Sequence, residues 1–140
     1  MDQSRRTFLT RTACLLCAGS LSGFLTSCDT VDTGEPIVNI AEYPELQTIG
    51  GAIKKRYSRL NESDPILIIR ETQDHFVVYS AICTHQQAVL RLPKDGIIIC
   101  PNHGSKFSVV DGKVVSGEAY APLKQFPSHF DIQKNRLTIG

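Results

Sequence analysis

Short apolar runs separated by clusters of turn-forming residues dominate the chain beyond residue 35. The runs fall at 36–40, 53–60, 66–69, 76–82, 97–99, 107–110, 113–115, 129–132 and 137–139. They are too short for helices, and helical spacing is limited to one turn at 41–46. Asn, Asp, Ser, Gly and Pro fill the breaks, and Asp111-Gly112 is the strongest hairpin signal. The pattern predicts an all-β fold of short strands.

Two groups of side chains have expected environments. Tyr57, Tyr79 and Tyr120 are predicted to pack in the interior. The basic run at 54–56 is predicted to lie on a solvated strand face, from which it can also dock an acidic partner.

The composition is that of one ordinary globular domain. The chain has 140 residues, of which 41% are hydrophobic and 21% charged. Its formal net charge of +1 comes from the first 27 residues, which hold three arginines and one aspartate. The rest carries 12 basic and 13 acidic residues, a net charge of −1. Because no basic patch with interleaved aromatic residues occurs, nucleic-acid binding is not expected.

The N-terminal pattern differs from the rest and predicts export. Arg5-Arg6, followed by Thr-Phe-Leu, resembles a twin-arginine (Tat) signal. The apolar segment at 12–25 is interrupted by glycine and serine, and a membrane-spanning helix needs about 20 apolar residues. The segment ends in Leu-Thr-Ser-Cys28, which resembles a bacterial lipobox with a lipid on the Cys28 thiol. For the paired arginines the alternative is the basic region of a plain secretory signal, and for residues 25–28 it is an ordinary cleavage site. The expected division is an export signal peptide (1–27), a lipid-anchored tether (28–35) and a domain (36–140).

Two pairs of metal-ligating side chains provide the candidate chemistry. The first pair is Cys83-x-His85 and the second is Cys100-x2-His103, with fourteen residues between the two pairs. Each pair directly follows an apolar run, so two strand ends can present the four side chains from two short loops. Thiolate and neutral imidazole suit iron–sulphur clusters and zinc. Structural zinc sites usually pair like ligands closely, Cys with Cys and His with His, so zinc is the less favoured alternative.

The C-x-H…C-x2-H spacing resembles the Rieske [2Fe–2S] motif, in which two thiolates bind one iron and two imidazoles bind the other. The flanking positions that share the resemblance are Pro101, Gly104, Ser105, Phe107, the segment 111–117 and Ala121-Pro122-Leu123. The resemblance covers about residues 36–140. It implies Rieske-type stacked antiparallel sheets with a small cluster-binding subdomain at about 83–124. It also implies one [2Fe–2S] cluster, held by Cys83 and Cys100 on one iron and by His85 and His103 on the other.

Two neighbouring positions are expected to tune the cluster, because hydrogen bonds to cluster sulphurs raise its potential. In quinol-oxidising members of the family, a Ser after His-Gly and a Tyr two residues later both donate such bonds. Ser105 keeps the first bond here, whereas Phe107 cannot make the second. The disulfide that links the two loops in those members is also absent, because its positions match Ala88 and Asn102. We therefore expect an intermediate midpoint potential.

The resemblance implies a carrier of single electrons rather than an enzyme acting alone. Because the Tat route carries folded proteins and clusters are inserted in the cytoplasm, the leader and the motif support each other. We expect a protein tethered to the periplasmic, outer face of the cytoplasmic membrane. Its expected partners are redox proteins of a respiratory-type chain, either a cytochrome or the catalytic subunit of a periplasmic oxidoreductase.

Three other functions stay open. The first is a quinol-oxidising subunit of a cytochrome bc-type complex, with quinol as a partner. The absent disulfide, the absent Tyr and the lipid anchor argue against it. The second is an oxygenase ferredoxin, against which the leader argues. The third is a non-redox zinc module.

Overall fold

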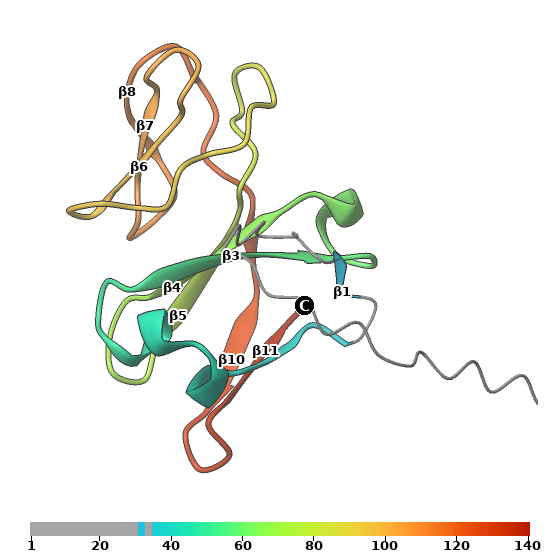
Figure 1. Ribbon diagram of the computed structural model, residues 1–140. Coiled ribbons are helices and arrows are strands. Elements are labelled where there is room, and N and C mark those ends of the chain that lie inside the picture. Colours follow the sequence, from blue (N-terminus) through green and yellow to red (C-terminus); the bar gives the residue numbers. More distant parts are fainter. Residues whose placement is uncertain (1–30, 33–34) are drawn as a thin grey trace, which may run out of the picture.

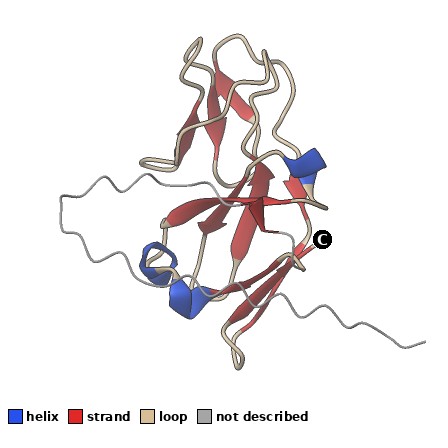
Figure 2. Cartoon of the chain, turned by 45° about the vertical axis from the view of Figure 1, so that its right-hand side comes forward, coloured by secondary structure: helices blue, strands red, loops and turns tan. Residues whose placement is uncertain are grey.

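The computed structural model describes residues 31–32 and 35–140, which form three β-sheets (Figures 1 and 2). The first sheet has the order β1-β3-β4-β5-β9, with β1 Val31–Asp32, β3 Ala52–Tyr57, β4 Ile66–Arg70, β5 Phe76–Ser80 and β9 Gln125–Phe126. The second has the order β10-β11-β2, with β10 Ser128–Asp131, β11 Arg136–Ile139 and β2 Ile37–Asn39. The third has the order β6-β7-β8, with β6 Ile97–Ile99, β7 Lys106–Ser108 and β8 Val114–Ser116.

Helical structure in the described ranges is limited to short 3₁₀ turns. These are η1 Ile40–Glu42, η2 Pro44–Gln47 and η3 Asn61–Ser63. The turn predicted at 41–46 is thus present, divided between η1 and η2. Over residues 31–32 and 35–140, no helix is long and apolar enough to cross a membrane. The all-β prediction is confirmed.

The first two sheets stack on each other and enclose one hydrophobic core. Their strands contribute buried residues to a single cluster, among them Val38, Leu137 and Ile139 from the second sheet. The strand pairs in both sheets are antiparallel, except that β1 pairs with β3 in parallel. We call these two stacked sheets the base.

The central strands β4 and β5 serve two cores because both of their faces are covered. Four of their side chains face the base core, namely Ile66, Ile68, Phe76 and Val78. The alternating four face a second buried cluster, namely Leu67, Ile69, Val77 and Tyr79. A strand alternates its side chains between its two faces, so a near-continuous apolar sequence is what two covered faces require.

The second core belongs to the small subdomain (83–124), which contains β6, β7 and β8. It leaves the base after β5 and returns at β9, and Figure 1 shows it projecting from one end of the base, away from β10 and β11. Its buried members include Leu90, Ile98, Phe107 and Leu123. The predicted arrangement, stacked antiparallel sheets with a small subdomain, is confirmed.

Three local features differ from the sequence prediction. Strand β9 was not expected, because its two residues show no alternation and form a strand by pairing with β5. The β7–β8 connection runs over 109–113, longer than the tight turn predicted at Asp111-Gly112. Val31 and Asp32, inside the predicted tether, pair with Arg56 and Tyr57 of β3. The predicted export signal (1–27) and the predicted Cys28 lipid anchor lie outside the described residues.

Candidate metal centre

The two predicted ligand pairs lie on two loops that share one hydrogen-bonding pattern. In the first ligand loop (83–88), the Cys83 N–H donates to the Ala88 carbonyl at 2.8 Å, and the Gln87 N–H donates to the Cys83 carbonyl at 2.9 Å. In the second ligand loop (100–105), the corresponding bonds join Cys100 to Ser105 at 2.8 Å and residue 104 to Cys100 at 3.1 Å. Each loop closes on itself, so the backbone positions that carry the ligand side chains are fixed relative to each other.

Both loops need one residue in the left-handed backbone region, at the fourth position after the cysteine. Gln87 has a φ of 55° and Gly104 has a φ of 71°. Glycine adopts this conformation without cost, whereas most other residues do so at a modest cost. The second ligand loop thus meets this backbone demand with a glycine, and the first loop meets it with a glutamine.

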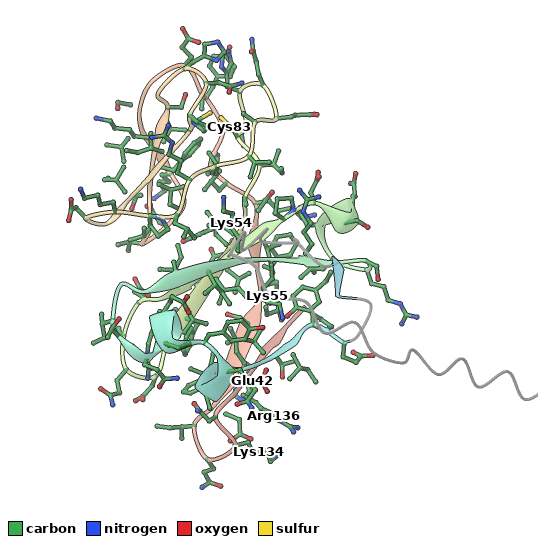
Figure 3. The ribbon with its side chains drawn as sticks, viewed as in Figure 1. Glu42, Lys54, Lys55, Cys83, Lys134 and Arg136 are labelled. Carbon is green, nitrogen blue, oxygen red and sulfur yellow. The ribbon has the colours of Figure 1, made fainter. Side chains whose placement is uncertain are left out.

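The two cysteines are buried free thiols next to each other. Cys83 is 1% exposed and Cys100 is 2% exposed, and both belong to the core of the small subdomain. Burial raises the pKa of Cys83, and the adjacent Cys100 thiol raises it further, while backbone N–H groups of His85 and Gln86 act in the opposite direction. A buried pair of thiolates is unfavourable without a cation, which is what a metal centre supplies. Figure 3 shows Cys83 within the small subdomain.

The two histidines meet at the outer end of the same site. Their ring centroids lie 4.9 Å apart, with 72° between the ring planes. The His85 Nδ1 atom is buried and has no hydrogen-bond partner among the described residues. The Glu118 carboxylate comes within 3.5 Å of this atom, outside hydrogen-bonding geometry. His103 is exposed. A buried ring nitrogen without a partner, two residues after the buried Cys83 in the same ligand loop, fits a centre with two Cys and two His ligands.

Glu118 was not predicted as part of this site. One ligand atom each from His85, His103 and Glu118 lies within 4.8 Å of the others. Glu118 lies 33 residues after His85 in the chain, so motif spacing gave no signal for it. Its side chain is 60% exposed, in keeping with a position at the rim.

The two predicted tuning positions, Ser105 and Phe107, are both fully buried at 0% exposure. The Ser105 Oγ atom accepts hydrogen bonds from the backbone N–H groups of Glu118 and Ala119, each at 3.1 Å. Phe107 packs in the same hydrophobic cluster as the two cysteines and brings no hydroxyl. The Ser105 hydroxyl is therefore a polar group beside the site, and Phe107 is an apolar one.

The covering loop (117–122) holds Tyr120, for which the sequence prediction was wrong. Tyr57 and Tyr79 are buried as expected, but Tyr120 is 85% exposed. Its ring meets the His85 ring edge-on, with centroids 6.3 Å apart and planes at 85°. The Thr84 hydroxyl holds this loop in place by donating to the Ala121 carbonyl at 2.7 Å. An exposed aromatic ring thus lies next to the histidine pair.

The basic run at 54–56 is only partly solvated, contrary to the prediction. The Lys54 ammonium donates to the carbonyl of Leu90 at 2.9 Å, which joins β3 to the small subdomain (Figure 3). The Lys55 ammonium donates to the Tyr43 hydroxyl at 2.8 Å. These bonds cross 36 and 12 residues of sequence, so composition alone does not predict them.

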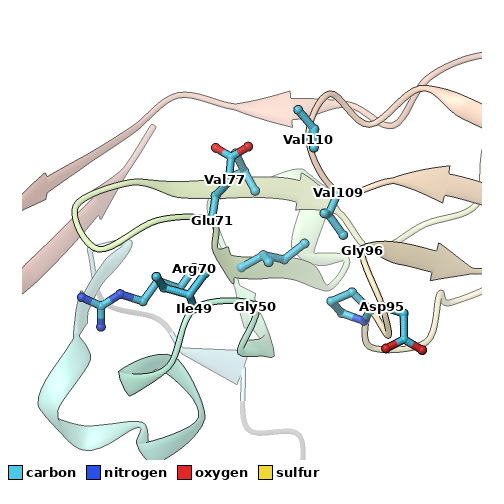
Figure 4. A pocket seen from close by; sticks show the side chains of 11 residues that line it. Ile49, Gly50, Arg70, Glu71, Val77, Asp95, Gly96, Val109 and Val110 are labelled. Carbon is cyan, nitrogen blue, oxygen red and sulfur yellow. The ribbon is translucent and has the colours of Figure 1, made fainter.

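A mostly apolar pocket of about 350 Å³ lies apart from the candidate ligands, between the base and the turns at 93–96 and 109–110. Figure 4 shows its lining, with Ile49 and Val77 on one side and Val109 and Val110 on the other. It contains none of the four predicted ligands. This pocket and the candidate centre are therefore separate features of the described residues.

Comparison with known proteins gives a consistent family. The family model for the Rieske [2Fe-2S] domain matches residues 42–127. A solved structure, the plasma-membrane Rieske protein of the cyanobacterium Synechocystis, has a TM-score of 0.54 at 22% identity, covering 64% of this chain and 86% of that one. At that identity, the likeness supports the fold.

Three relatives of known sequence are similar over about 80 residues each. A Haloferax mediterranei protein, provisionally named as the Rieske subunit of a respiratory nitrate reductase, is 31% identical over 47% of this chain and 36% of its own length. The cytochrome b6-f complex iron-sulfur subunit of Chlorobaculum tepidum is 35% identical over 56% of this chain and 43% of its own length. The ferredoxin component of an alkene monooxygenase system from Xanthobacter autotrophicus is 32% identical over 58% of this chain and 65% of its own length. The match spans less than two thirds of each relative.

Proposed function

The chain belongs to the Rieske [2Fe-2S] domain family, whose model covers more than half of it. From this family and from the leader sequence, we propose that it is an exported, membrane-tethered carrier of single electrons. Family membership implies a Rieske-type [2Fe–2S] cluster, which when bound takes up and releases one electron. The observation that carries the proposal is the histidine pair at the projecting tip, with His103 exposed and His85 beside it.

We assign the four ligands from their placement. Cys83 and Cys100, buried in the core of the small subdomain, would hold the inner iron, and His85 and His103 would hold the outer one. The apolar neighbours of the cysteines exclude water from the sulphur side. The histidine side faces solvent, so a partner protein can approach it directly. With two neutral imidazoles among the ligands, the potential is expected in the range of roughly −150 to +300 mV.

The ligand assignment is tested by comparing a variant that lacks a proposed ligand histidine with a variant that lacks a histidine outside the site. His103→Ala removes a proposed ligand, whereas His129→Ala replaces an exposed histidine of β10 far from the tip. We expect the reduced-state EPR signal of the full chain to disappear in the first variant and to persist in the second. A protein that contains zinc and no sulphide would contradict the electron-transfer proposal.

The proposed partners are redox proteins outside the cytoplasm, a cytochrome or the catalytic subunit of a periplasmic oxidoreductase. The support comes from the leader, in which Arg5 and Arg6 match a Tat signal and Cys28 matches a lipidation site. The relatives have several roles, including respiratory nitrate reductase, cytochrome b6-f and monooxygenase ferredoxin. The buried Phe107 disfavours the quinol-oxidising role, because it offers no hydroxyl to raise the potential.

Export and lipidation are tested by charge-conserving variants. Replacing both Arg5 and Arg6 with lysine keeps the positive charge, so it blocks a Tat signal but not a plain secretory signal. We expect this variant to keep its cluster and stay in the cytoplasm. Cys28→Ser is expected to abolish the lipid mass on the mature protein, whereas Cys17→Ser is expected to leave it in place. Export of the lysine variant, or a mature protein without lipid, would contradict the proposed tethering.

A further inference from the structure

Gly117, at the start of the covering loop, lies against Ser105 more closely than any side chain would permit. A Cβ atom at position 117 would lie 2.5 Å from the Ser105 Cα, 2.9 Å from its Oγ and 3.1 Å from its Cβ. The nearest of these is a backbone atom, which cannot rotate away. Gly117 also has a φ of +102°, in the region that favours glycine.

This close approach brings two backbone donors onto one hydroxyl. The N–H groups of Glu118 and Ala119, the next two residues, both donate to the Ser105 Oγ at 3.1 Å. Ser105 is 0% exposed, so water does not compete for the oxygen. The pair of bonds fixes both the position of the hydroxyl oxygen and the course of the covering loop.

The same two bonds determine what the hydroxyl can still do. A serine hydroxyl has one hydrogen to donate and two lone pairs to accept with. Both lone pairs are used by Glu118 and Ala119, so the hydrogen is directed away from them. Among the described residues, none accepts this hydrogen. A buried donor without a partner is unfavourable, and two N–H donors on its oxygen polarise the O–H group and make it a stronger donor.

We propose that Gly117 is a positioning residue, which sets the midpoint potential of the cluster by holding the Ser105 hydroxyl as an obligate donor toward it. Hydrogen bonds to the cluster favour its reduced, more negative form. Gly117 contributes no polar group of its own and acts wholly through Ser105. The inference rests on the cluster that family membership implies and not on the proposed export route or partners.

The test is a set of redox titrations monitored by EPR on the full, cluster-loaded chain. Gly117→Ala is expected to lower the midpoint potential, since its Cβ pushes the loop off Ser105 and frees the hydroxyl. Ser105→Ala is expected to lower it by at least as much. In the double variant the potential is expected to equal that of Ser105→Ala alone, because Gly117 then has no hydroxyl to position. All values are compared with the wild type, so the comparison holds whichever partner protein is used.

Gly96→Ala is the matched control. Gly96 lies in the same subdomain with a φ of +77°, and the nearest atom to an added Cβ is a Val109 methyl at 4.0 Å. The substitution introduces the same kind of backbone strain without touching Ser105. We expect its midpoint potential and EPR g-values to match the wild type. A fall equal to that of Gly117→Ala would overturn the proposal, as would a Gly117→Ala effect that persists unchanged in the Ser105→Ala background.

A second measurement decides the matter if Gly117→Ala does not load its cluster. Amide hydrogen exchange of the oxidised protein reports on the Glu118 and Ala119 N–H groups directly. Losing one hydrogen bond is expected to speed their exchange about tenfold in Ser105→Ala, while the Ser108 and Val109 amides of the neighbouring hairpin exchange as before. Unchanged exchange at 118 and 119 would mean that the hydroxyl is not held by these donors, and the proposal would be wrong.

Discussion

Phe107→Tyr places a hydroxyl in the core beside the proposed ligands, and the structure determines the magnitude of its effect. Phe107 is 0% exposed and packs with Cys83 and Cys100. A buried hydroxyl without a partner costs about 1–3 kcal/mol of folding stability. For a domain of about 100 residues, each kcal/mol lowers Tm by about 4–8 °C.

If the new hydroxyl donates to a cysteine sulphur, its two expected effects are a preserved stability and a raised potential. A hydrogen bond to a charged acceptor exceeds one to a neutral acceptor by about 1 kcal/mol, so the bond strengthens on reduction. A tenfold change in a one-electron equilibrium is about 59 mV, so 1 kcal/mol is about 40 mV. We expect Phe107→Tyr to raise the midpoint by about 40 mV with Tm within a few degrees of the wild type.

The assays are an EPR-monitored redox titration and thermal unfolding of the same preparation. Phe76→Tyr is the control, because Phe76 is 2% exposed and lies in the base core, away from the cysteines. It is expected to lose stability with no change in potential. A Phe107→Tyr protein that is several degrees less stable at an unchanged potential would refute the reasoning, because its hydroxyl would then lack an acceptor.

Three further predictions concern the interior. Gly112→Ala is expected to lower the free energy of unfolding in urea by about 2–4 kcal/mol, because φ is +66° there and the added Cβ would lie 2.9 Å from the Tyr79 ring. Gly50→Ala is the control, with a φ of +84° and no atom within 4 Å of the added Cβ, and it is expected to cost about 1 kcal/mol. Burial raises the pKa of Tyr79 from 10.0 to about 12, so the stability that the neutral phenol contributes is full below pH 10 and falls as the pH rises toward 12. Tyr79→Phe is therefore expected to lose less stability than the wild type between pH 10 and pH 12, and an identical loss would contradict this prediction. Lys54→Met keeps the aliphatic stem but removes the ammonium that pairs with the Leu90 carbonyl, so it is expected to cost about 1–3 kcal/mol of folding stability and to speed amide exchange in the first ligand loop. Unchanged exchange would show that this hydrogen bond does not support the loop.

What the sequence predicted well was local. The ligand spacing and the glycine at 104 belong to short self-closing loops, and the runs at 66–69 and 97–99 are close to the observed strands. Apolar runs and turn residues depend on nearby positions, so they can be recognised without knowing the fold. The stacked sheets followed from the family resemblance rather than from the pattern alone.

What the sequence did not predict depends on contacts between distant segments. Lys54 lies next to Leu90 only because β3 and the small subdomain meet in space, and Glu118 approaches His85 only through the course of the covering loop. Tyr120 is an aromatic residue of a type usually found packed, yet its loop projects beyond the small subdomain core. Strand β9 exists because β5 presents an unpaired edge to residues 125–126.

The way the small subdomain is attached to the base has a consequence for protein engineering. The chain leaves the base at the end of β5 and returns at β9, and these two strands are direct neighbours, with Tyr79 opposite Gln125. Paired antiparallel strands lie about 5 Å apart, so the two ends of the insertion lie as close together as the ends of an ordinary hairpin. We therefore expect that the forty or so residues between them can replace the turn of an antiparallel hairpin in a host protein. Because β4 and β5 supply one wall of its core, the host hairpin must also present an apolar outer face, and that second condition limits which scaffolds can receive a redox centre in this way.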